Sequence, residues 1–290
     1  MDGVIVLDKP AGFTSHDAVQ KARRILNIKR IGHLGTLDPL ATGVLPLVIG
    51  RATRLAQFFR YRDKVYQGVM RLGFSTDTYD RTGAATSAEE PVNVSREEIE
   101  VVFREFTGRL QQVPPPVSAK KVDGVEAYKL ARKNQPVELE PVAVEVMEFA
   151  LLEFNPPLVH FRVHCSGGTY VRSLVHDSGR RLACGAHVAE LRRLASGEFT
   201  EEDARTPDQL AALVAEGRAA EALVPAEKLL PEFPTYKLPP SVVTSVMHGR
   251  DFRTVPPIQA AHIKVLAPDG RLLAIADRGQ LGFFHPAIVL

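Results

Sequence analysis

The sequence predicts an α+β protein, because segments patterned as strands and segments capped as helices both occur along the chain. Residues 142–154 and 158–165 alternate apolar and polar side chains on either side of a proline-containing turn, which predicts adjacent antiparallel strands. A Ser-Arg-Glu-Glu capping box at 95–98 and a Thr-Pro pair at 206–207 each predict the start of a helix.

The length and a change in composition predict two units. A chain of 290 residues can bury a core for one large domain and a small one. Near residue 233, Phe-Pro and Pro-Pro pairs mark a linker, and a hairpin is predicted over 262–276. We expect one large domain over 1–232, of a size that can hold a catalytic site, and a small β-rich module over 233–290.

Composition excludes several classes of protein. Hydrophobic residues make up 45% and charged residues 24%, as in ordinary globular proteins. No apolar run is long enough to span a bilayer, and the N-terminus lacks the basic region of a signal peptide. Cys165 and Cys184 are the only cysteines, with no CxxC spacing. We expect a cytoplasmic protein with no disulfide framework, no metal and no membrane contact.

The charge is unevenly distributed along the chain. Residues 1–72 carry 12 Lys and Arg against 5 Asp and Glu, a net charge of +7, whereas residues 201–232 carry 3 against 8, a net charge of −5. A basic surface in the first segment would suit a phosphate backbone. The alternative is an ordinary solvated face.

The most informative stretch is Gly-His-Leu-Gly-Thr-Leu-Asp-Pro-Leu-Ala-Thr-Gly-Val-Leu at 32–45. Three glycines and a proline predict a loop with demanding backbone geometry, and the apolar run at 44–49 predicts a core strand after it. Asp38 is thereby held on a stiff loop. On this pattern alone Asp38 is either a catalytic carboxylate or a turn residue that caps backbone N–H groups.

Two other residues have both a structural and a functional interpretation. Period-two alternation at 65–73 puts Tyr66 on one face with Gly68, Met70 and Leu72, so Tyr66 is either a core residue or a site residue. Lys9 lies in a Lys-Pro turn after a short strand. It is either a solvated lysine or a support for the loop.

The stretch at 32–45 resembles the signature loop of the TruB family, the bacterial-type tRNA pseudouridine synthases that isomerise uridine 55 in the T loop. A Gly-Thr-Tyr-Val-Arg segment at 168–172 also matches a family motif, and the resemblance extends over roughly residues 3 to 230. It implies the pseudouridine-synthase fold, a mixed and largely antiparallel sheet flanked by helices, followed by a small PUA-like RNA-binding module.

The resemblance implies three catalytic residues. Asp38 would be the catalytic aspartate, Arg172 would pair with it across the pocket, and Tyr66 would stack on the target base. Gly68 would leave room beside that ring. Five further residues would bind or support the substrate, namely His33, Tyr170, Leu191, Lys9 and Asp80.

These five residues have different implied roles. His33 would occupy the position vacated by the flipped base, Tyr170 would line the pocket, and Leu191 would pack against the uracil. Lys9 would have a structural or electrostatic role beneath the loop. Asp80 either holds a basic partner near the site or ends a strand.

A basic, proline-containing insertion over about 112–138 resembles a family segment and is expected to contact RNA. The implied substrate is the T stem-loop of tRNA, the implied assembly is a monomer, and the isomerisation demands no cofactor. The target base must leave its stack to reach a buried carboxylate. Asp38 would attack C1′, attack C6 or remove a C2′ proton; the sequence leaves these three roles open.

Two other functions fit parts of the pattern. A non-catalytic RNA chaperone that refolds tRNA would use the same basic surface. A glycoside hydrolase would use Asp38 as nucleophile, but it needs a second carboxylate about 5–10 Å away, which the loop does not supply.

Overall fold

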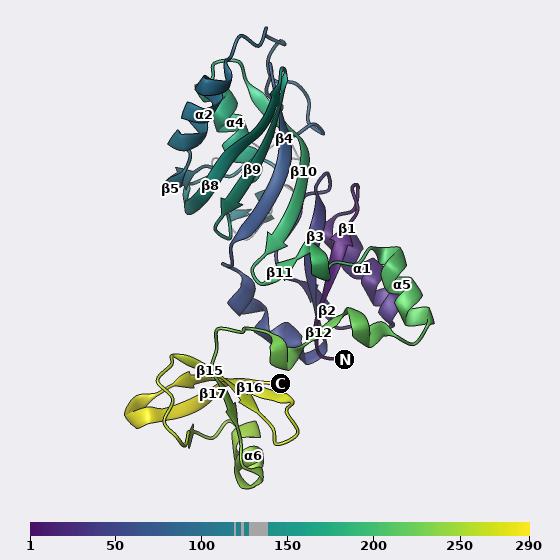
Figure 1. Cartoon of the computed structure of the whole chain (residues 1–290), viewed down its shortest axis with the longest axis vertical. Helices are drawn as coiled ribbons and strands as arrows, with labels where there is room; N and C mark the ends of the chain where they lie inside the picture. The colour runs from purple at the N-terminus through teal and green to yellow at the C-terminus, as the bar shows by residue number, and fades with distance from the viewer. Residues whose placement is uncertain (119, 123–124, 128–138) are drawn as a thin grey trace.

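The computed structural model describes residues 1–118, 120–122, 125–127 and 139–290. Its main feature is a ten-stranded sheet with helices packed on it, so the predicted α+β class is confirmed (Figure 1). The strand order is β12-β1-β3-β10-β4-β9-β8-β5, with β11 paired to β10 and β2 to β3. The bounds of these strands are β1 Gly3–Lys9, β2 Ile31–His33, β3 Thr42–Ile49, β4 Lys64–Leu72, β5 Gly108–Gln112, β8 Val142–Asn155, β9 Leu158–Cys165, β10 Ala186–Ser196, β11 Phe199–Thr200 and β12 Leu223–Pro225. Within the described residues, β6 Lys121–Val122 and β7 Val125–Glu126 form a separate small pair.

The large sheet is mixed and largely antiparallel, as predicted. Among the described strands of this sheet, β3 and β10 form the one parallel pair. In it, Thr42 is paired with Arg192 and Gly43 with Arg193. A Cβ atom on Gly43 would lie 2.3 Å from the backbone oxygen of Arg193, and its φ is +97°. Only glycine permits this approach, so Gly43 fixes how the two halves of the sheet meet.

Four α-helices pack against one hydrophobic core on the same face of the sheet. Figure 1 shows α2 beside α4, and α1 beside α5. The capping box at Ser95 and the Thr206 N-cap with Pro207 in the first turn are both present, as the sequence predicts. The helix bounds are α1 Ser15–Leu26, α2 Arg96–Glu105, α4 Val171–Arg181 and α5 Pro207–Ala215.

A second sheet of five strands follows the first, in the order β13-β15-β16-β17-β14. The predicted hairpin is formed by β15 and β16, which pair antiparallel. This β-rich unit confirms the expected kind of C-terminal structure, while the proposed boundary between 232 and 233 stays a prediction. Its elements are β13 Thr235–Lys237, α6 Pro240–Met247, β14 Phe252–Arg253, β15 His262–Leu266, β16 Leu272–Arg278 and β17 Phe283–Val289.

Strand β1 is buried on both faces, which explains its uninterrupted apolar run. Ile5 and Leu7 belong to the core under the helices, whereas Val4 and Val6 belong to a second cluster. That second cluster also contains residues of the C-terminal sheet, namely Leu272, Ile275, Ile288 and Leu290. The two sheets therefore share this second cluster, in addition to the core that each has of its own.

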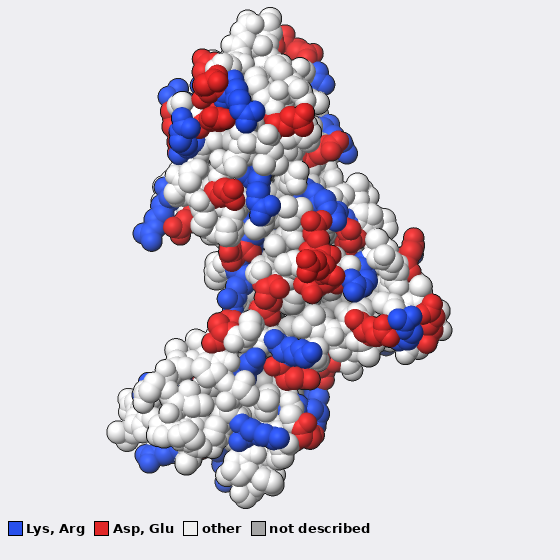
Figure 2. Space-filling view, in the orientation of Figure 1, with Lys and Arg blue, Asp and Glu red and all other residues white. Residues whose placement is uncertain are grey.

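The described residues contain no helix that is both long and apolar enough to cross a membrane. The face drawn in Figure 2 carries both signs of charge, with acidic side chains gathered near its middle. Glu201, Glu202 and Asp203 are exposed directly after β11, in the segment whose net charge is negative.

Candidate active site

The loop that carries Asp38 is shorter than the sequence indicates. Of the stretch 32–45, the first residues belong to β2 and the last ones to β3, so residues 34–41 form the loop itself. The hydroxyl of Ser15 accepts from the backbone N–H of Leu37 at 2.8 Å and donates to its carbonyl at 3.1 Å. Helix α1 therefore fixes the loop one residue before Asp38.

Lys9 supports the loop from below. Its side chain is fully buried, and its Nζ donates to the backbone carbonyls of Pro10 at 2.9 Å, Phe13 at 2.7 Å and Pro39 at 3.4 Å. Burial lowers the pKa of Lys9 to about 8, although the Asp38 carboxylate opposes that shift. This geometry agrees with a supporting role and leaves Lys9 no surface with which to bind substrate, contrary to its predicted place among the substrate-binding residues.

Arg193 supports the same loop from the sheet. It is 1% exposed, and its guanidinium donates to the carbonyls of Val44 at 2.7 Å, Gly35 at 3.1 Å and Thr36 at 3.4 Å. None of the sequence motifs marks Arg193 as a site residue. The signal was present, because alternation along β10 places it on the same face as Leu191.

Asp38 and Arg172 form a bidentate ion pair. Nε of Arg172 donates to Oδ2 of Asp38 at 2.8 Å, and Nη2 donates to Oδ1 at 3.0 Å. The Arg172 side chain is 5% exposed and the Asp38 side chain 33% exposed. This is the contact that the resemblance implied, and paired N–H donors fix the plane of the carboxylate.

The remaining donors of Arg172 are held by the surrounding chain. Nη1 donates to the carbonyl of Thr78 at 2.9 Å, and Nη2 donates to the carbonyl of Val117 at 3.0 Å. Asp80 Oδ2 lies 3.6 Å from Nη1. Of the two interpretations of Asp80, the structure supports the one in which it holds a basic partner, since it is buried beside Arg172.

Asp38 faces a cavity of about 220 Å³. Residues from the loop, the start of β4, the glycine turn before α4, and β10 line it. The lining includes Asp38, Arg172, Tyr66, Tyr170 and Leu191, so these five predicted residues are brought together. It also includes residues not predicted for the site, namely Gly35, Thr36, Leu37, Arg60, Lys64, Gly168, Thr169, Val171 and Arg193.

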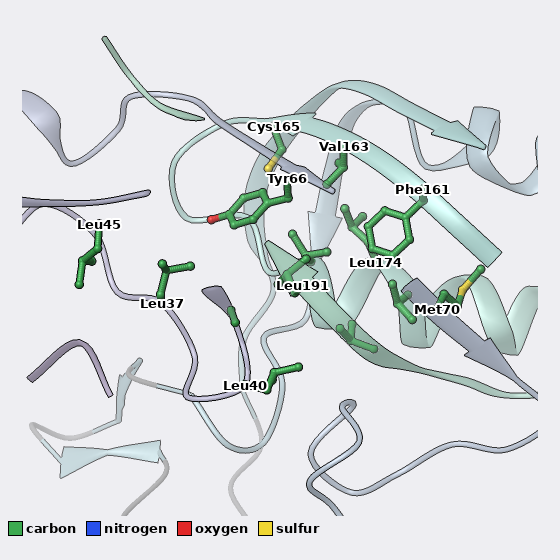
Figure 3. Packing of buried hydrophobic residues seen from close by; sticks show 14 of the residues in the cluster. Leu37, Leu40, Leu45, Tyr66, Met70, Phe161, Val163, Cys165, Leu174 and Leu191 are labelled. Carbon is green, nitrogen blue, oxygen red and sulfur yellow. The ribbon is translucent and has the colours of Figure 1, made fainter. Parts of the chain in front are cut away.

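Tyr66 is both a core residue and a cavity residue. It is 8% exposed, and Figure 3 shows its hydroxyl directed toward the side on which Leu37 lies, away from Val163 and Phe161. Burial raises the pKa of the Tyr66 phenol, and the nearby Arg193 guanidinium opposes that shift. The phenol is thus protonated at neutral pH.

Gly68 lies close to two neighbouring strands of the sheet. A Cβ atom there would lie 2.6 Å from Cζ of Phe161 and 2.7 Å from the carbonyl oxygen of Glu190. Whether Gly68 also leaves room beside the Tyr66 ring stays a prediction. The absent side chain at 68 serves packing of the sheet.

His33 lies at the end of β2, outside the residues that line the cavity. Its Nδ1 atom is buried and has no hydrogen-bond partner among the described residues. Burial, followed by the charge of Arg193, lowers its pKa. Its proposed contact with RNA stays a prediction.

Much of the predicted basic insertion lies outside the described residues, including Lys129, Arg132 and Lys133. In the described part of the segment, Nζ of Lys120 donates to the carbonyl of Glu140 at 2.6 Å. The expected RNA contact of this insertion also stays a prediction.

The chemistry available in the cavity is that of one carboxylate. Among the described residues, Asp38 is the only Asp or Glu in its lining, and Asp80, beside Arg172, is buried. The pair of accessible carboxylates that a glycoside hydrolase needs is therefore missing from this lining. In the described part of the chain, no group of three or more His, Cys, Asp or Glu is placed to hold a metal ion.

Solved structures share the fold over nearly the whole chain. The protein titled "Crystal Structure of a Cbf5-Nop10-Gar1 Complex" matches 97% of this chain and 79% of its own, with a TM-score of 0.73 and 31% identity. A second, "Structure of H/ACA RNP bound to a substrate RNA containing 2'-deoxyuridine", covers 95% of this chain and 77% of that one, with a TM-score of 0.71 and 30% identity. Fold and site together define a pseudouridine synthase.

The family follows from the sequence matches. Residues 23–171 match the model of the TruB family pseudouridylate synthase N-terminal domain, and residues 172–231 match that of the tRNA pseudouridylate synthase B C-terminal domain. Among curated proteins, tRNA pseudouridine synthase B of Solibacter usitatus is 52% identical to this chain, and the match covers 100% of both chains. The same enzyme of Stutzerimonas stutzeri is 41% identical over 99% of this chain and 94% of its own. The chain belongs to the TruB family.

Proposed function

We propose that this protein isomerises uridine to pseudouridine in tRNA, at position 55 of the T loop, with Asp38 as the catalytic carboxylate. The observation that carries the proposal is the bidentate Asp38–Arg172 pair at the wall of a cavity, on a chain that matches tRNA pseudouridine synthase B enzymes over its full length. The paired donors of Arg172 fix the plane of the carboxylate at the cavity wall, where it would act as nucleophile or base.

The cavity suits a single base removed from its stack. Tyr66 offers a ring face and Leu191 an apolar side chain, and both lie in the lining with Asp38. Leu191 also borders a wider groove of about 420 Å³, whose lining contains Gln67, Arg81 and other polar residues. The flipped uridine would enter past Leu191 while its neighbours stay in that groove.

The remaining parts of the proposal concern the partner. One chain supplies every named residue of the cavity, so the enzyme would act as a monomer on the T stem-loop. The C-terminal sheet would act as a PUA-like RNA-binding module, and the site of action would be the cytoplasm, where bacterial tRNA is modified.

The test is a pseudouridine assay on purified protein with an unmodified tRNA transcript. A transcript with cytidine at position 55 serves as the matched control. Pseudouridine should form only at position 55 of the first transcript. Binding of tRNA without any pseudouridine would support a chaperone instead and would overturn the proposal.

A further inference from the structure

Lys64 is a cavity residue to which the reaction has so far given no role. It is the first residue of β4 and lies two positions before Tyr66, so both side chains are on the same face of the strand. Both line the cavity that contains Asp38. Lys64 is only 6% exposed, which is unusual for a lysine.

The ammonium group of Lys64 forms no ion pair among the described residues. Its Nζ donates to the backbone carbonyl of Arg62, and within the described residues it has no carboxylate within 4.0 Å. Among the described residues, the hydrogen bonds of Arg193, the neighbouring cation, all go to backbone carbonyls. A buried cation without a counterion is costly, so its retention indicates a use.

The two cations lie side by side under the loop. A Cβ atom on Gly35 would be 3.7 Å from both Nη1 of Arg193 and Cε of Lys64. Arg60 and Arg172 are two further cations in the lining, and among the described residues Asp38 is the single carboxylate there. The wall of the cavity thus carries an excess of positive charge.

The other groups that face Lys64 leave this excess in place. Cys165 is the residue of β9 that pairs with Lys64 in the sheet. Burial raises the pKa of its thiol to about 12, which keeps the thiol neutral. Asp63, next in the chain, is bound to Nε2 of His164 at 2.6 Å. Burial and then Arg193 lower the pKa of Lys64 to about 8, so the ammonium form still predominates at neutral pH.

The reaction generates a negative charge that such a wall would meet. When the C1′–N1 bond breaks, its electron pair stays on the uracil, which becomes an anion. C5 then bonds to C1′ and gives up its proton, and N1 takes up one proton, so the atoms balance without a further reactant. If Asp38 attacks C1′, its ester bond to C1′ breaks when C5 bonds there, and if it removes the C2′ proton, it returns that proton afterwards. If Asp38 attacks C6, the uracil is anionic from that addition onward, and the carboxylate leaves C6 at the end.

We propose that Lys64 is a further catalytic residue, whose ammonium group stabilises the anionic uracil between cleavage of C1′–N1 and formation of C5–C1′. The inference rests on the proposed function. A fixed cation in a cavity sheltered from water acts more strongly than one in solvent, and it needs no reorganisation during the reaction. Arg193 is a positioning residue, since its donors hold the loop.

The first test replaces the charge and keeps the length of the side chain. Lys64→Met should lower the single-turnover rate of pseudouridine formation by about 100-fold, the scale of one electrostatic donor. The dissociation constant for tRNA should stay within about twofold of the wild-type value. Lys228→Met makes the same change at an exposed lysine of the acidic segment and should leave both quantities unchanged.

The second test uses pH and does not depend on how well Lys64→Met folds. The wild-type single-turnover rate should fall above about pH 8, as the ammonium loses its proton. Lys9 titrates in the same range, so a second variant is needed to assign the alkaline decline to Lys64. In Lys64→Arg the guanidinium stays charged throughout this range. The alkaline decline should be absent or shifted upward in that variant.

Three results would overturn the inference. These are a Lys64→Met rate within threefold of wild type, a wild-type rate that is flat from pH 7 to 9, or an unchanged rate with tRNA binding weakened tenfold or more. The last would make Lys64 a ligand of a substrate phosphate. Failure of the proposed function is distinct, because the wild-type protein would then form no pseudouridine at all.

Discussion

Arg172 and Asp38 are 134 positions apart in the sequence, yet the Arg172 guanidinium donates to both Asp38 carboxylate oxygens, from Nε at 2.8 Å and from Nη2 at 3.0 Å. The two residues come from opposite sides of the β3–β10 junction, Asp38 from the loop before β3 and Arg172 from the first turn of α4, which packs on β10. The ion pair therefore closes the cavity only when both halves of the sheet are correctly joined.

Asp38→Asn should abolish isomerisation while leaving folding and RNA binding nearly intact. The amide has the shape of the carboxylate and lacks only its charge and basicity. We expect the single-turnover rate to fall by at least about 10³-fold, as for other single catalytic groups. Pseudouridine formation and the tRNA dissociation constant should be measured separately.

Asp208→Asn is the matched control for that change, since Asp208 is an exposed residue at the start of α5. It should behave as wild type in both measurements. Substantial turnover by Asp38→Asn would remove Asp38 from the chemistry.

Arg172→Lys should impair both catalysis and stability. A lysine ammonium cannot make two parallel bonds to Asp38 and also serve the carbonyls of Thr78 and Val117. Since these carbonyls lie in a buried part of the site, losing their donors should cost about 1–3 kcal/mol. Denaturant unfolding and single-turnover rates measure the two effects. A variant with wild-type stability and rate would show that charge alone suffices at position 172.

Two substitutions of Tyr66 distinguish a catalytic role of this residue from a purely structural one. If the hydroxyl takes part in a late proton transfer, Tyr66→Phe should bind tRNA normally but turn over slowly. Tyr66→Leu should in addition lose stacking on the base, worth roughly 1–3 kcal/mol. Melting temperatures of both variants report on the core, where Tyr66 is 8% exposed. A Phe variant that reacts at the wild-type rate would restrict Tyr66 to packing and stacking.

Local features of the fold were predictable from the sequence. The helix caps at Ser95 and Thr206 and the antiparallel pair of β8 and β9 depend on residues close together in the chain. The parallel pairing of β3 with β10 was not predictable in this way. It joins residues about 150 positions apart, and the close approach at Gly43 is visible only in the structure.

The site was predictable to the extent that a motif marks it. The loop around Asp38 and the segment around Arg172 resemble family motifs, and their contact is present. Lys64 and Arg193 were missed because a charged residue in an alternating strand is ordinarily placed on the solvent face. The resemblance implied the place of Lys9 beneath the loop, but nothing in a Lys-Pro turn shows which carbonyls lie around its ammonium group.

Acid should destabilise the protein through His176. Its ring stacks on Tyr79, with centroids 3.7 Å apart and planes at 8°, and burial, assisted by Arg180, lowers its pKa to about 4. Its ordinary pKa is about 6.5, so between pH 6.5 and 4 the unfolded chain binds a proton that the folded protein does not. Stability contributed by the neutral ring is therefore lost as pH falls through this window.

His176→Phe keeps an aromatic ring against Tyr79 and removes the titration. On going from pH 7 to pH 5, the wild-type protein should lose about 1 kcal/mol more of its free energy of unfolding than the variant does. Urea unfolding at the two pH values measures the difference. Equal losses in both proteins would assign the acid sensitivity to other groups.

The two sheets should unfold together. Leu272 and Ile275 of the C-terminal sheet share a cluster with Val4 and Val6 of β1, so removing residues 234–290 would uncover part of the catalytic domain's core. The change in composition near 233 predicts a small module, but which of its side chains pack against β1 is visible only in the structure. We expect a single calorimetric transition for the full chain.

Ile275→Ala tests this coupling against a matched substitution, Ile263→Ala, in the C-terminal unit's own core. Both remove the same atoms from fully buried positions, and each should cost about 2–5 kcal/mol. If the sheets are coupled, both variants shift the same single transition to lower temperature. If instead Ile263→Ala moves one transition and leaves a second at the wild-type temperature, the C-terminal sheet unfolds on its own, and the shared cluster does not make the chain cooperative.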